Sequence, residues 1–438
     1  MTRATKLVGM IAVLVLVAAA CTTDDGEVTP TEGPVLIGAD GLLSDTYVTL
    51  PETEGMYFSG PALSDVAGYN AFLPKYEEKA GTGPIQSFHA HAYDATNLLL
   101  AALQADGVAE VADDGTVTIS RQALRDALYA IDGFQGLTGS LSCNEFGDCA
   151  QPAISVYENV DPVDSIGGVF ANVRYTSRPE GAAEKTGPDP REGADATDRT
   201  ITIAPGDPIK IASLQAISGA VASLGTDQVT AIDVAIDDAG GELFGHPIQQ
   251  DPQEDDLCSA EGGEAGAQRI VSDDQIVGVI GTSCSGAAAS AMPILERRGY
   301  SMVSGSNTSP GLTATGYLAE GDLEVGENWR YGFFRTAHND EFQGQGSAQF
   351  VFENLGLRTA ATIHDGDPYT EGLVTQFRDF FEALGGEVVV FTSINKGDTD
   401  MRPVLTEIQQ ADPEAIYFPI FQPEGDFIVR QALEIFGE

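Results

Sequence analysis

Positive charge is scarce in this chain. Among 438 residues, 22 are Lys or Arg and 66 are Asp or Glu, so the formal net charge is −44. Such a chain repels phosphate backbones and anionic lipid headgroups, which argues against nucleic acid as a partner. The acidic residues are spread along the sequence rather than gathered in a tail, and we interpret them as a solvated surface.

Long apolar runs are missing as well. The longest one, Leu7–Ala20, is shorter than the ~20 residues of a transmembrane helix, and it follows the basic residues Arg3 and Lys6. This order is typical of a signal peptide, which we predict at residues 1–20. The remainder of the chain is expected to be soluble and to lie outside the cytoplasm.

The signal peptide is followed by a cysteine. Residues 18–21 read Ala-Ala-Ala-Cys, which resembles the lipobox of bacterial lipoproteins, with Ala18 where Leu is preferred. The pattern predicts a lipid on Cys21 and a tether over residues 21–34, which are polar and rich in Thr and Pro. The protein is therefore expected to be anchored to the cell membrane by this lipid, at the cell surface or in the periplasm.

Cysteine is also rare, with five in the whole chain. Without Cys21 an even number remains, which in an oxidising compartment favours disulfides. Cys143 and Cys149 are six residues apart and suit a small looped disulfide, which leaves Cys258 to pair with Cys284. A zinc site is the alternative, but no histidine lies near either pair in the sequence.

Catalytic motifs are absent. The sequence has no P-loop, no Gly-x-Ser-x-Gly and no His-Glu-x-x-His motif. His89 and His91 are two residues apart, so on a helix they do not share a face. Cys284 has serine neighbours but no indicated base. We therefore expect no enzymatic activity, no metal and no cofactor.

Alternating strands and helices fill the second half of the chain, in two runs at 207–335 and 338–438. Repeated βα units with short turns indicate an α/β fold with doubly wound parallel sheets. The expected strands are Ile209–Ser213, Ile248–Gln250, Ile276–Ile280, Met302–Val303, Thr359–His364, Glu387–Phe391 and Ala415–Pro419. The expected helices are Thr226–Asp238, Ala265–Ser272, Ser285–Arg298, Thr370–Leu384, Met401–Gln410 and Gly425–Phe436.

The first half of the chain differs in pattern. The expected elements are strands at Val35–Gly38 and Gly55–Phe58, helices at Phe88–Leu103 and Arg121–Ile131, and an antiparallel pair formed by Leu137–Cys143 and Ile154–Glu158. Residues 177–206 are rich in Pro, Gly and charged residues and poor in apolar ones. They are predicted to be a flexible linker.

The two ends of the chain complement each other. The helix Gly425–Phe436 has no strand after it, and the strand Val35–Gly38 has no helix before it, whereas a parallel sheet needs alternating units. We therefore predict that Val35–Gly38 pairs with Ala415–Pro419 and that the chain is circularly permuted. The alternative is an inverted order that arose by gene assembly.

Several short stretches carry a family resemblance. In the second half they are Ser218-Gly219 to Leu224-Gly225, Gly281–Gly286, Ser306–Pro310 with Leu312-Thr313, His364-Asp365 to Tyr369–Gly372, and Gln431-Ala432. In the first half they are Ile37–Gly41, Glu54–Tyr57, Tyr93–Ala95, and Gly139 to Val156-Tyr157. Residues 207–438 resemble the first two-thirds of the type I periplasmic binding proteins of the leucine/isoleucine/valine-binding kind, and residues 35–158 resemble the remaining third.

The resemblance implies two lobes joined by three crossing strands. Lobe one would comprise 61–135 and 207–335, and lobe two would comprise 35–58, 136–176 and 338–438. The crossings would fall near Arg335–Ala337, Tyr57–Gly60 and Gln135–Leu137. In that family the lobes close on a ligand, so the resemblance implies a cleft between them.

A carboxylate site is expected where the helix Ser285–Arg298 begins. A helix N-terminus offers free N–H groups and partial positive charge, so the Ser285 hydroxyl and the Gly286 amide are candidates, although Ser285 could be only an N-cap. The resemblance gives Ser306 a backbone contact and Thr308 a hydroxyl contact with the ligand. The alternative for these two is an ordinary turn.

Asp40 follows the strand Val35–Gly38 and could pair with an α-ammonium group, or it could simply form an Asp-Gly turn. Tyr369 and Phe421 match aromatic positions that cover the ligand in the family. Leu224 stands where branched-chain amino-acid binders often have an aromatic residue, which leaves another amino acid or a short amide open as the ligand.

The resemblance thus implies an extracytoplasmic protein that binds an amino acid, most of all a branched-chain one, and delivers it to an ABC permease. A monomer is expected. One rival is a ligand-sensing module for a membrane receptor, and another is an extracytoplasmic enzyme, for which no acid/base pair is evident.

Overall fold

The computed structural model describes residues 33–63, 67–179, 186–192, 194, 199–319 and 321–437. The predicted signal peptide, the lipid site Cys21, the tether up to residue 32 and parts of the predicted linker lie outside these residues. Two large sheets organise the described chain, and both belong to one unit, residues 31–438.

The six-stranded sheet has the order β11-β12-β10-β13-β14-β17 and is parallel except for β11. Its strands are β11 (Glu242–Leu243), β12 (His246–Asp255), β10 (Ile209–Gln215), β13 (Ile276–Gly281), β14 (Met302–Ser304) and β17 (Phe333–Arg335). All strands predicted in residues 207–335 are present, and the sheet confirms the α/β class for this part of the chain.

Helices cover both faces of this sheet. On one side lie α3 (His89–Leu103) and α6 (Ala222–Asp238), and on the other lie α7 (Ala260–Ile270) and α8 (Ser285–Arg297). Side chains of neighbouring strand residues pack on opposite faces of the sheet. Val303 packs with the α3 and α6 cluster, and Met302 packs with the α7 and α8 cluster. Burial on both faces explains why the central strand β13, with the sequence IVGVIG, is apolar throughout.

The seven-stranded sheet has the order β19-β18-β20-β1-β2-β7-β8. Its strands are β19 (Glu387–Ser393), β18 (Thr359–His364), β20 (Ala415–Tyr417), β1 (Val35–Gly38), β2 (Tyr57–Pro61), β7 (Ile154–Glu158) and β8 (Val173–Ser177). The first five strands pair in parallel, and β7 pairs antiparallel with both β2 and β8.

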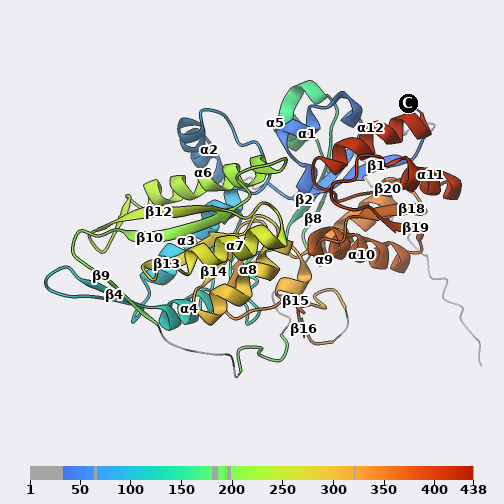
Figure 1. Cartoon of the computed structure of the whole chain (residues 1–438). Coiled ribbons are helices and arrows are strands. Elements are labelled where there is room, and N and C mark those ends of the chain that lie inside the picture. Colours follow the sequence, from blue (N-terminus) through green and yellow to red (C-terminus); the bar gives the residue numbers. More distant parts are fainter. Residues whose placement is uncertain are drawn as a thin grey trace, which may run out of the picture. The chain divides into compact units, whose positions relative to one another are not determined.

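Strand β1 lies beside β20, as predicted. Val35 pairs with Ala415 and Ile37 with Tyr417 in parallel register, and Figure 1 shows the blue β1 next to the red β20. The two described ends of the chain also meet, because a Cβ atom on Gly33 would lie 3.3 Å from Phe436 Cβ. The adjacency is confirmed, and circular permutation as its origin stays a prediction.

Helices cover both faces of the seven-stranded sheet too. They are α9 (Asp340–Gln349) and α10 (Pro368–Ala383) on one face, and α1 (Asp45–Val48), α5 (Ser165–Ala171), α11 (Arg402–Ala411) and α12 (Glu424–Phe436) on the other. Tyr417 and Phe377 stack with ring centroids 4.6 Å apart on the first face, while Ile416 and Ile428 pack on the second. Apolar side chains therefore fill the space between the sheet and the helices on both of its faces.

The antiparallel pair expected from Leu137–Cys143 and Ile154–Glu158 is wrong. The first stretch forms β6 (Ser140–Leu141), which pairs with β5 (Phe134–Gln135), whereas β7 is sandwiched between β2 and β8. The Asp94 carboxylate on α3 accepts hydrogen bonds from the Leu137 and Thr138 amides and holds this stretch away from β7.

The third crossing between the sheets also differs from the expectation. Leu137, Leu141 and Cys149 pack with apolar residues of α3 and its neighbours beside the six-stranded sheet. The chain therefore reaches the seven-stranded sheet only between Cys149 and β7, not at Gln135–Leu137.

One end of the predicted linker is ordered. Thr200–Ile203 forms strand β9, which pairs antiparallel with β4 (Val117–Ser120), and β4 pairs in turn with β3 (Ala109–Val111). Ile201 and Ile203 alternate with polar residues and are buried in the core beside α3. The linker expectation is therefore wrong for these four residues, because two apolar side chains suffice to dock a short strand.

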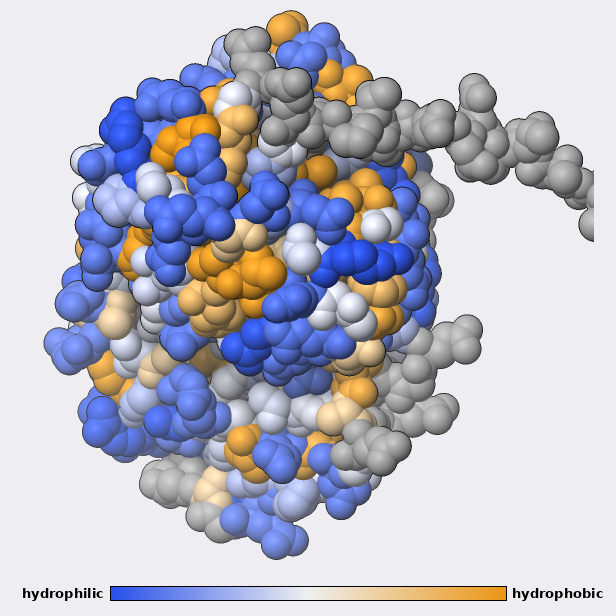
Figure 2. Space-filling view, turned by 90° about the vertical axis from the view of Figure 1, so that its right-hand side faces the viewer, coloured by the Kyte–Doolittle hydropathy of each residue, from blue (hydrophilic) through white to orange (hydrophobic). Residues whose placement is uncertain are grey.

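The surface agrees with the composition. Figure 2 shows one face on which hydrophilic residues predominate and apolar ones gather in separate small patches. Among the described residues, no helix has both the length and the apolar character needed to cross a membrane.

Candidate functional site

Helix α8 starts where strand β13 ends, at the carboxyl edge of the six-stranded sheet. Ser285 is the first helical residue, and Cys284 holds the N-cap position, so the N-cap interpretation of Ser285 is wrong. The Ser285 hydroxyl is buried and accepts a hydrogen bond from the Ser309 amide at 3.3 Å. It thus joins the helix start to the loop after β14.

Gly286 faces a carboxylate from the other sheet. A Cβ atom on Gly286 would lie 2.7 Å from Oδ2 of Asp367, the N-cap residue of α10. Asp367 also pairs with Lys396 at 2.8 Å. The helix start that was predicted to attract a ligand carboxylate therefore already lies against an anionic group, in keeping with the positive end of the helix dipole.

The loop before α8 is rigidly held. Asp256 accepts hydrogen bonds from the Cys258 amide at 2.7 Å and the Ser283 amide at 2.6 Å, and burial raises its pKa to about 7. The disulfide Cys258–Cys284 joins the same two segments. Both predicted disulfides, this one and Cys143–Cys149, are present in the structure.

Ser306 and Thr308 follow strand β14 and differ in their partners. The Ser306 hydroxyl donates to the Ser283 carbonyl at 2.8 Å and accepts from Gln228 Nε2 at 3.0 Å. The Thr308 hydroxyl is buried and has no hydrogen-bond partner among the described residues. Of the two side chains, Thr308 is therefore the one available to a ligand.

Asp40 stands just after β1 and is almost fully buried. Its Oδ1 accepts hydrogen bonds from Gln343 Nε2 at 2.6 Å and from the Tyr369 hydroxyl at 3.0 Å. Burial outweighs these two hydrogen bonds and raises the pKa of Asp40 from 3.8 to about 6. A positive group placed here would restore the charged form of the carboxyl.

A second buried carboxyl, Asp340 at the start of α9, was not found from the sequence. Its amide donates to the Thr308 carbonyl at 3.0 Å, and the Thr308 hydroxyl lies beside its carboxyl and lowers the pKa of Asp340. Burial, and then the nearby charge of Asp40, raise the pKa of Asp340 well above its usual range. Two unbalanced carboxyls therefore lie together in the interior, which is costly without a cation.

Little in the sequence pointed to Asp340. It reads Asn339-Asp340-Glu341, an N-cap followed by two acids in a first helical turn, which the helix dipole alone would explain. The one available signal was its place directly after the Arg335 crossing.

The charge of Arg335 acts on Asp340 and lowers its pKa, but the donors of Arg335 are engaged elsewhere. Its guanidinium pairs with Asp148 and donates to the Ser309 carbonyl at 2.8 Å and to Thr313 Oγ1 at 2.5 Å. Arg335 therefore positions the loop that carries Thr308 rather than neutralising the two carboxyls.

Tyr369 and Phe421 form an aromatic wall next to Asp40. Their ring centroids are 5.2 Å apart, and a Cβ atom on Gly41 would lie 2.9 Å from the Phe421 ring. Leu224 from the other sheet is buried in the same apolar cluster. An apolar lining drawn from both sheets thus adjoins the polar groups.

The seven predicted residues are all buried, and contacts connect them across the two sheets. Asp40 bonds to Tyr369, Tyr369 packs on Phe421, Asp340 bonds to Thr308, and Ser285 bonds to the loop that carries Ser306 and Thr308. A helix N-terminus for an anion, two carboxyls for a cation and an apolar wall suit a small zwitterion.

Among the described residues, no group of three or more His, Cys, Asp or Glu side chains could hold a metal ion. The site and the two parallel-rich sheets define a class of α/β ligand-binding proteins.

The chain belongs to the periplasmic binding protein family. The model of that family matches residues 208–435, just over half of the sequence. The match covers the six-stranded sheet from β10 onward and the strands β18, β19 and β20 of the other sheet.

Two curated relatives illustrate the likeness. The leucine-, isoleucine-, valine-, threonine- and alanine-binding protein of Pseudomonas aeruginosa is 30% identical over 228 residues, which are 52% of this chain and 57% of the relative. The Leu/Ile/Val-binding protein of Escherichia coli K12 is 30% identical over 226 residues, which are 51% of this chain and 58% of the relative. The chain thus spans less than two thirds of the length of these relatives.

Solved structures with similarity include a leucine-binding protein from Thermotoga maritima, with 25% identity, a TM-score of 0.45 and coverage of 52% of this chain and 60% of that chain. Another is a branched-chain amino acid transporter substrate-binding protein from Streptococcus pneumoniae in complex with isoleucine, with 26% identity, a TM-score of 0.44 and coverage of 52% and 61%.

Proposed function

We propose that this protein is an extracytoplasmic solute-binding protein that captures an amino acid between its two sheets and performs no chemistry on it. Its relatives are named as binding proteins for leucine, isoleucine and valine. The observation that carries the proposal is the pair of buried carboxyls, Asp40 and Asp340, in the same interior as the N-terminus of α8.

The ligand's ammonium group would lie between Asp40 and Asp340, donate hydrogen bonds to their carboxylates and balance their negative charge. Its carboxylate would take hydrogen bonds from the Ser285 hydroxyl and the Gly286 amide, displacing the Asp367 side chain. Thr308, whose buried hydroxyl lies beside Asp340, would complete the polar contacts. The aliphatic side chain would rest against Tyr369 and Phe421, which favours a branched-chain amino acid.

The two sheets would be the centres of two lobes that close on the ligand. In this proposal the lobes meet at the passages after β17, after β2 and before β7. The position of Asp367 supports this proposal. Asp367 caps α10, which covers the seven-stranded sheet, and its carboxylate lies against Gly286 of α8, which covers the six-stranded sheet.

Circular permutation is part of the same proposal. The family match begins at residue 208, and the relatives extend beyond the part that this match covers. Strands β1, β2, β7 and β8 complete the sheet that the matched part begins, which supports residues 35–177 as the displaced remainder.

The partner would be an ABC permease in the membrane, with a lipid on Cys21 as the anchor and a monomer as the working form. A ligand-sensing module for amino acids or short amides is the second candidate. Leu224, in place of an aromatic residue, is the feature that favours ligands other than branched-chain amino acids.

Calorimetric titration of residues 33–438 with a panel of amino acids tests the proposal. We expect binding of leucine, isoleucine or valine, and we expect Asp40→Asn to weaken it at least a hundredfold, because the ammonium group loses a charged partner. Asp113→Asn, an exposed change of the same kind, is the control and should leave affinity unchanged.

A folded sample, verified by circular dichroism, that binds none of the panel would contradict the amino-acid proposal. Binding that survives Asp40→Asn at full affinity would show that the ammonium partner is misassigned.

A further inference from the structure

A carboxylate of the chain itself lies close to the place proposed for the ligand's carboxylate. Asp367 is the N-cap residue of α10, and a Cβ atom on Gly286 would lie 2.7 Å from its Oδ2. Two bonds of about 1.5 Å separate a Cβ atom from its own amide nitrogen, so Oδ2 lies within about 6 Å of the Gly286 amide. That amide is one of the two groups proposed to bind the ligand's carboxylate.

The start of α10 fixes the orientation of the Asp367 side chain. Its Oδ1 accepts a hydrogen bond from the Tyr369 amide at 3.0 Å, which caps the helix. Its own amide donates to Asp365 Oδ1 at 3.0 Å, and the residue is 7% exposed. Since Oδ1 serves the cap, Oδ2 is the oxygen that faces α8.

Lys396 pairs with Oδ2 but is shared with other acids. Its Nζ lies 2.8 Å from Oδ2, and its side chain is 45% exposed. Burial lowers the pKa of Lys396, but the acids around it raise that pKa by more. These acids are Asp367, Asp365 and Glu424. One cation therefore faces three acids, and the surroundings of Oδ2 keep a negative balance.

Asp367 therefore distinguishes between two end groups of a ligand. A carboxylate at the start of α8 must either displace Asp367 or place a second negative charge near Oδ2, to which it has no hydrogen to donate. A carboxamide carries no charge, and its NH₂ group donates hydrogen bonds to such an oxygen. The helix N-terminus favours the carboxylate, and Asp367 acts against that preference.

We propose that Asp367 is a specificity-determining residue that weakens the binding of a free amino acid relative to the amide of the same amino acid. This inference rests on the function proposed above, because it concerns the same site, and it adds amino-acid amides to the ligands. Lys396 acts in the opposite sense, since its positive charge screens Oδ2 and attracts a carboxylate.

Calorimetric titration with matched pairs of ligands tests the proposal. The pairs are leucine with leucinamide, isoleucine with isoleucinamide, and valine with valinamide, all at one pH and one ionic strength. The quantity measured is the Kd of the acid divided by the Kd of its amide. Effects of a variant on folding, or on the ammonium and side-chain contacts, are common to both ligands and cancel in this ratio.

Two variants should move the ratio in opposite directions. Asp367→Asn removes the charge and keeps a side-chain oxygen that can cap α10, so the ratio should shift at least fivefold in favour of the acid. Lys396→Met leaves Oδ2 without its cation, so the ratio should shift at least threefold in favour of the amide. Asp400→Asn, an exposed change just before α11, is the control and should leave the ratio unchanged.

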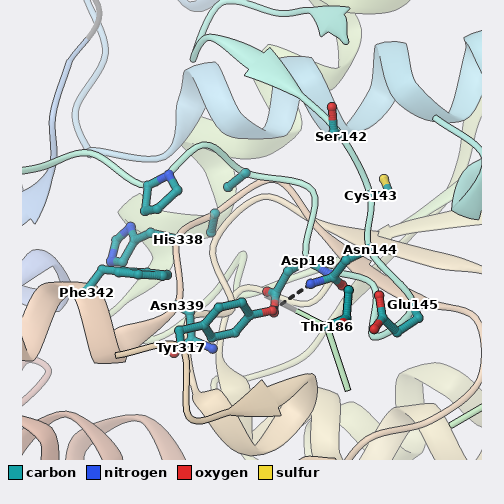
Figure 3. A pocket seen from close by; sticks show the side chains of 13 residues that line it. Ser142, Cys143, Asn144, Glu145, Asp148, Thr186, Tyr317, His338, Asn339 and Phe342 are labelled. Atoms are coloured by element: carbon teal, nitrogen blue, oxygen red, sulfur yellow. Dashed lines mark hydrogen bonds between the residues drawn. The ribbon is translucent and has the colours of Figure 1, made fainter. Parts of the chain in front are cut away.

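A cavity of about 250 Å³ beside the Cys143–Cys149 loop is separate from this site. Figure 3 shows its lining, with His338 and Phe342 at one end and Glu145 at the other. Its walls include neither of the residues changed in the two variants. A ligand bound only there would keep one ratio in every variant, so a shift of the ratio assigns binding to the start of α8.

An unchanged ratio in folded Asp367→Asn, with both ligands of a pair bound, would overturn the inference and leave the proposed function intact. A shift toward the amide in Asp367→Asn, a shift toward the acid in Lys396→Met, or a fivefold shift in Asp400→Asn would overturn it as well. If the folded wild-type protein and folded Asp367→Asn bound neither member of any pair, the proposed function would be contradicted, and this inference with it.

Discussion

At the scale of single residues, the buried carboxyls govern how the protein responds to protons. Burial raises the pKa of Asp40 to about 6 and that of Asp340 well above its usual range. In the ligand-free protein a proton neutralises Asp40 at low pH, and in the proposed complex an ammonium group would do so. Proton and ligand therefore compete for the same carboxyl.

The sign of the pH effect follows from this competition. The pKa of Asp40 is higher in the folded chain than its ordinary value of 3.8, so the folded state binds protons more tightly between pH 4 and 6. We predict that this group's contribution to the stability of the ligand-free protein falls as pH rises through that window. Amino-acid affinity should change in the opposite sense and weaken about tenfold per pH unit below pH 6.

Calorimetry in buffers of different ionisation enthalpy checks this, because binding near pH 6 should release protons from the wild-type site. Other buried acids also contribute to a stability titration, because burial raises the pKa of Asp94 to about 6 as well. The Asp94 carboxylate accepts hydrogen bonds from the Leu137 and Thr138 amides, so its protonation should not respond to the ligand. Affinity that stays constant from pH 5 to 7.5 would contradict the assignment of Asp40.

At the scale of elements, close packing of a helix on a loop decides which glycines can be replaced. Gly225 lies in the first turn of α6, and a Cβ atom there would collide with the carbonyl of Ala216 after β10. The Ala216 amide in turn donates to the Ser283 hydroxyl at 2.9 Å. The start of α6 is thus connected to the loop that precedes Ser285.

We predict that Gly225→Ala lowers the free energy of unfolding by about 2 kcal/mol or more and weakens amino-acid binding, because backbone must move to admit the methyl group. Gly167→Ala is the matched control, since Gly167 lies in helix α5 with no atom within 4 Å of the new Cβ. It should be neutral or stabilising by up to about 1 kcal/mol. Urea denaturation of both variants measures the difference, and equal stabilities would contradict the packing argument.

The sequence predicted those elements whose pattern is local. Apolar runs such as Ile276–Ile280, followed by helices with one apolar face, predicted most strands of the two sheets, but not β8, β11 or β17. Helices α2 (Ala67–Ala80) and α9 were not predicted. The first contains Pro74 and many charged residues, and α9 carries Gly344 and Gly346, so neither has a clear apolar stripe. Packing against distant parts of the chain stabilises them.

The residues of the candidate site also fall into those that the sequence predicted and those that it did not. Ser285 could be inferred from a helix that starts after a buried strand, and Asp40, Tyr369 and Phe421 were identified mainly by resemblance. Asp340 and Gln343 could not be found, because their importance comes from Asp40, some 300 residues earlier in the sequence. Contacts of that separation leave no periodic signal in one sequence.

At the scale of the whole molecule, the seven-stranded sheet combines two distant parts of the chain. Strands β18, β19 and β20 come from the last 80 residues, and β1, β2, β7 and β8 come from residues 35–177. Because β1 pairs with both β20 and β2, the later strands would lose their neighbour without the earlier segment. The fold thus depends on two chain ends that lie together in space.

This adjacency predicts that the chain tolerates a different order. A variant that runs from residue 199 to 437, continues through a short Gly/Ser linker into residue 33, and ends at 192 has the order that our permutation proposal assigns to the unpermuted chain. The linker can be short because Gly33 lies against Phe436, and loop closure adds little cost. We expect the same circular dichroism spectrum and an amino-acid affinity within about threefold of the original.

Residues 199–437 alone are the control for the reordered chain. This fragment keeps the whole six-stranded sheet but lacks four strands of the other sheet, as well as Asp40, so it should neither unfold cooperatively as a native domain nor bind the amino acid. If the reordered chain failed to fold while the original order folded, strand adjacency would not be enough to make the two orders equivalent. If instead the fragment bound with full affinity, residues 33–192 would have no part in the site, and the pairing of β1 with β20 would serve stability alone.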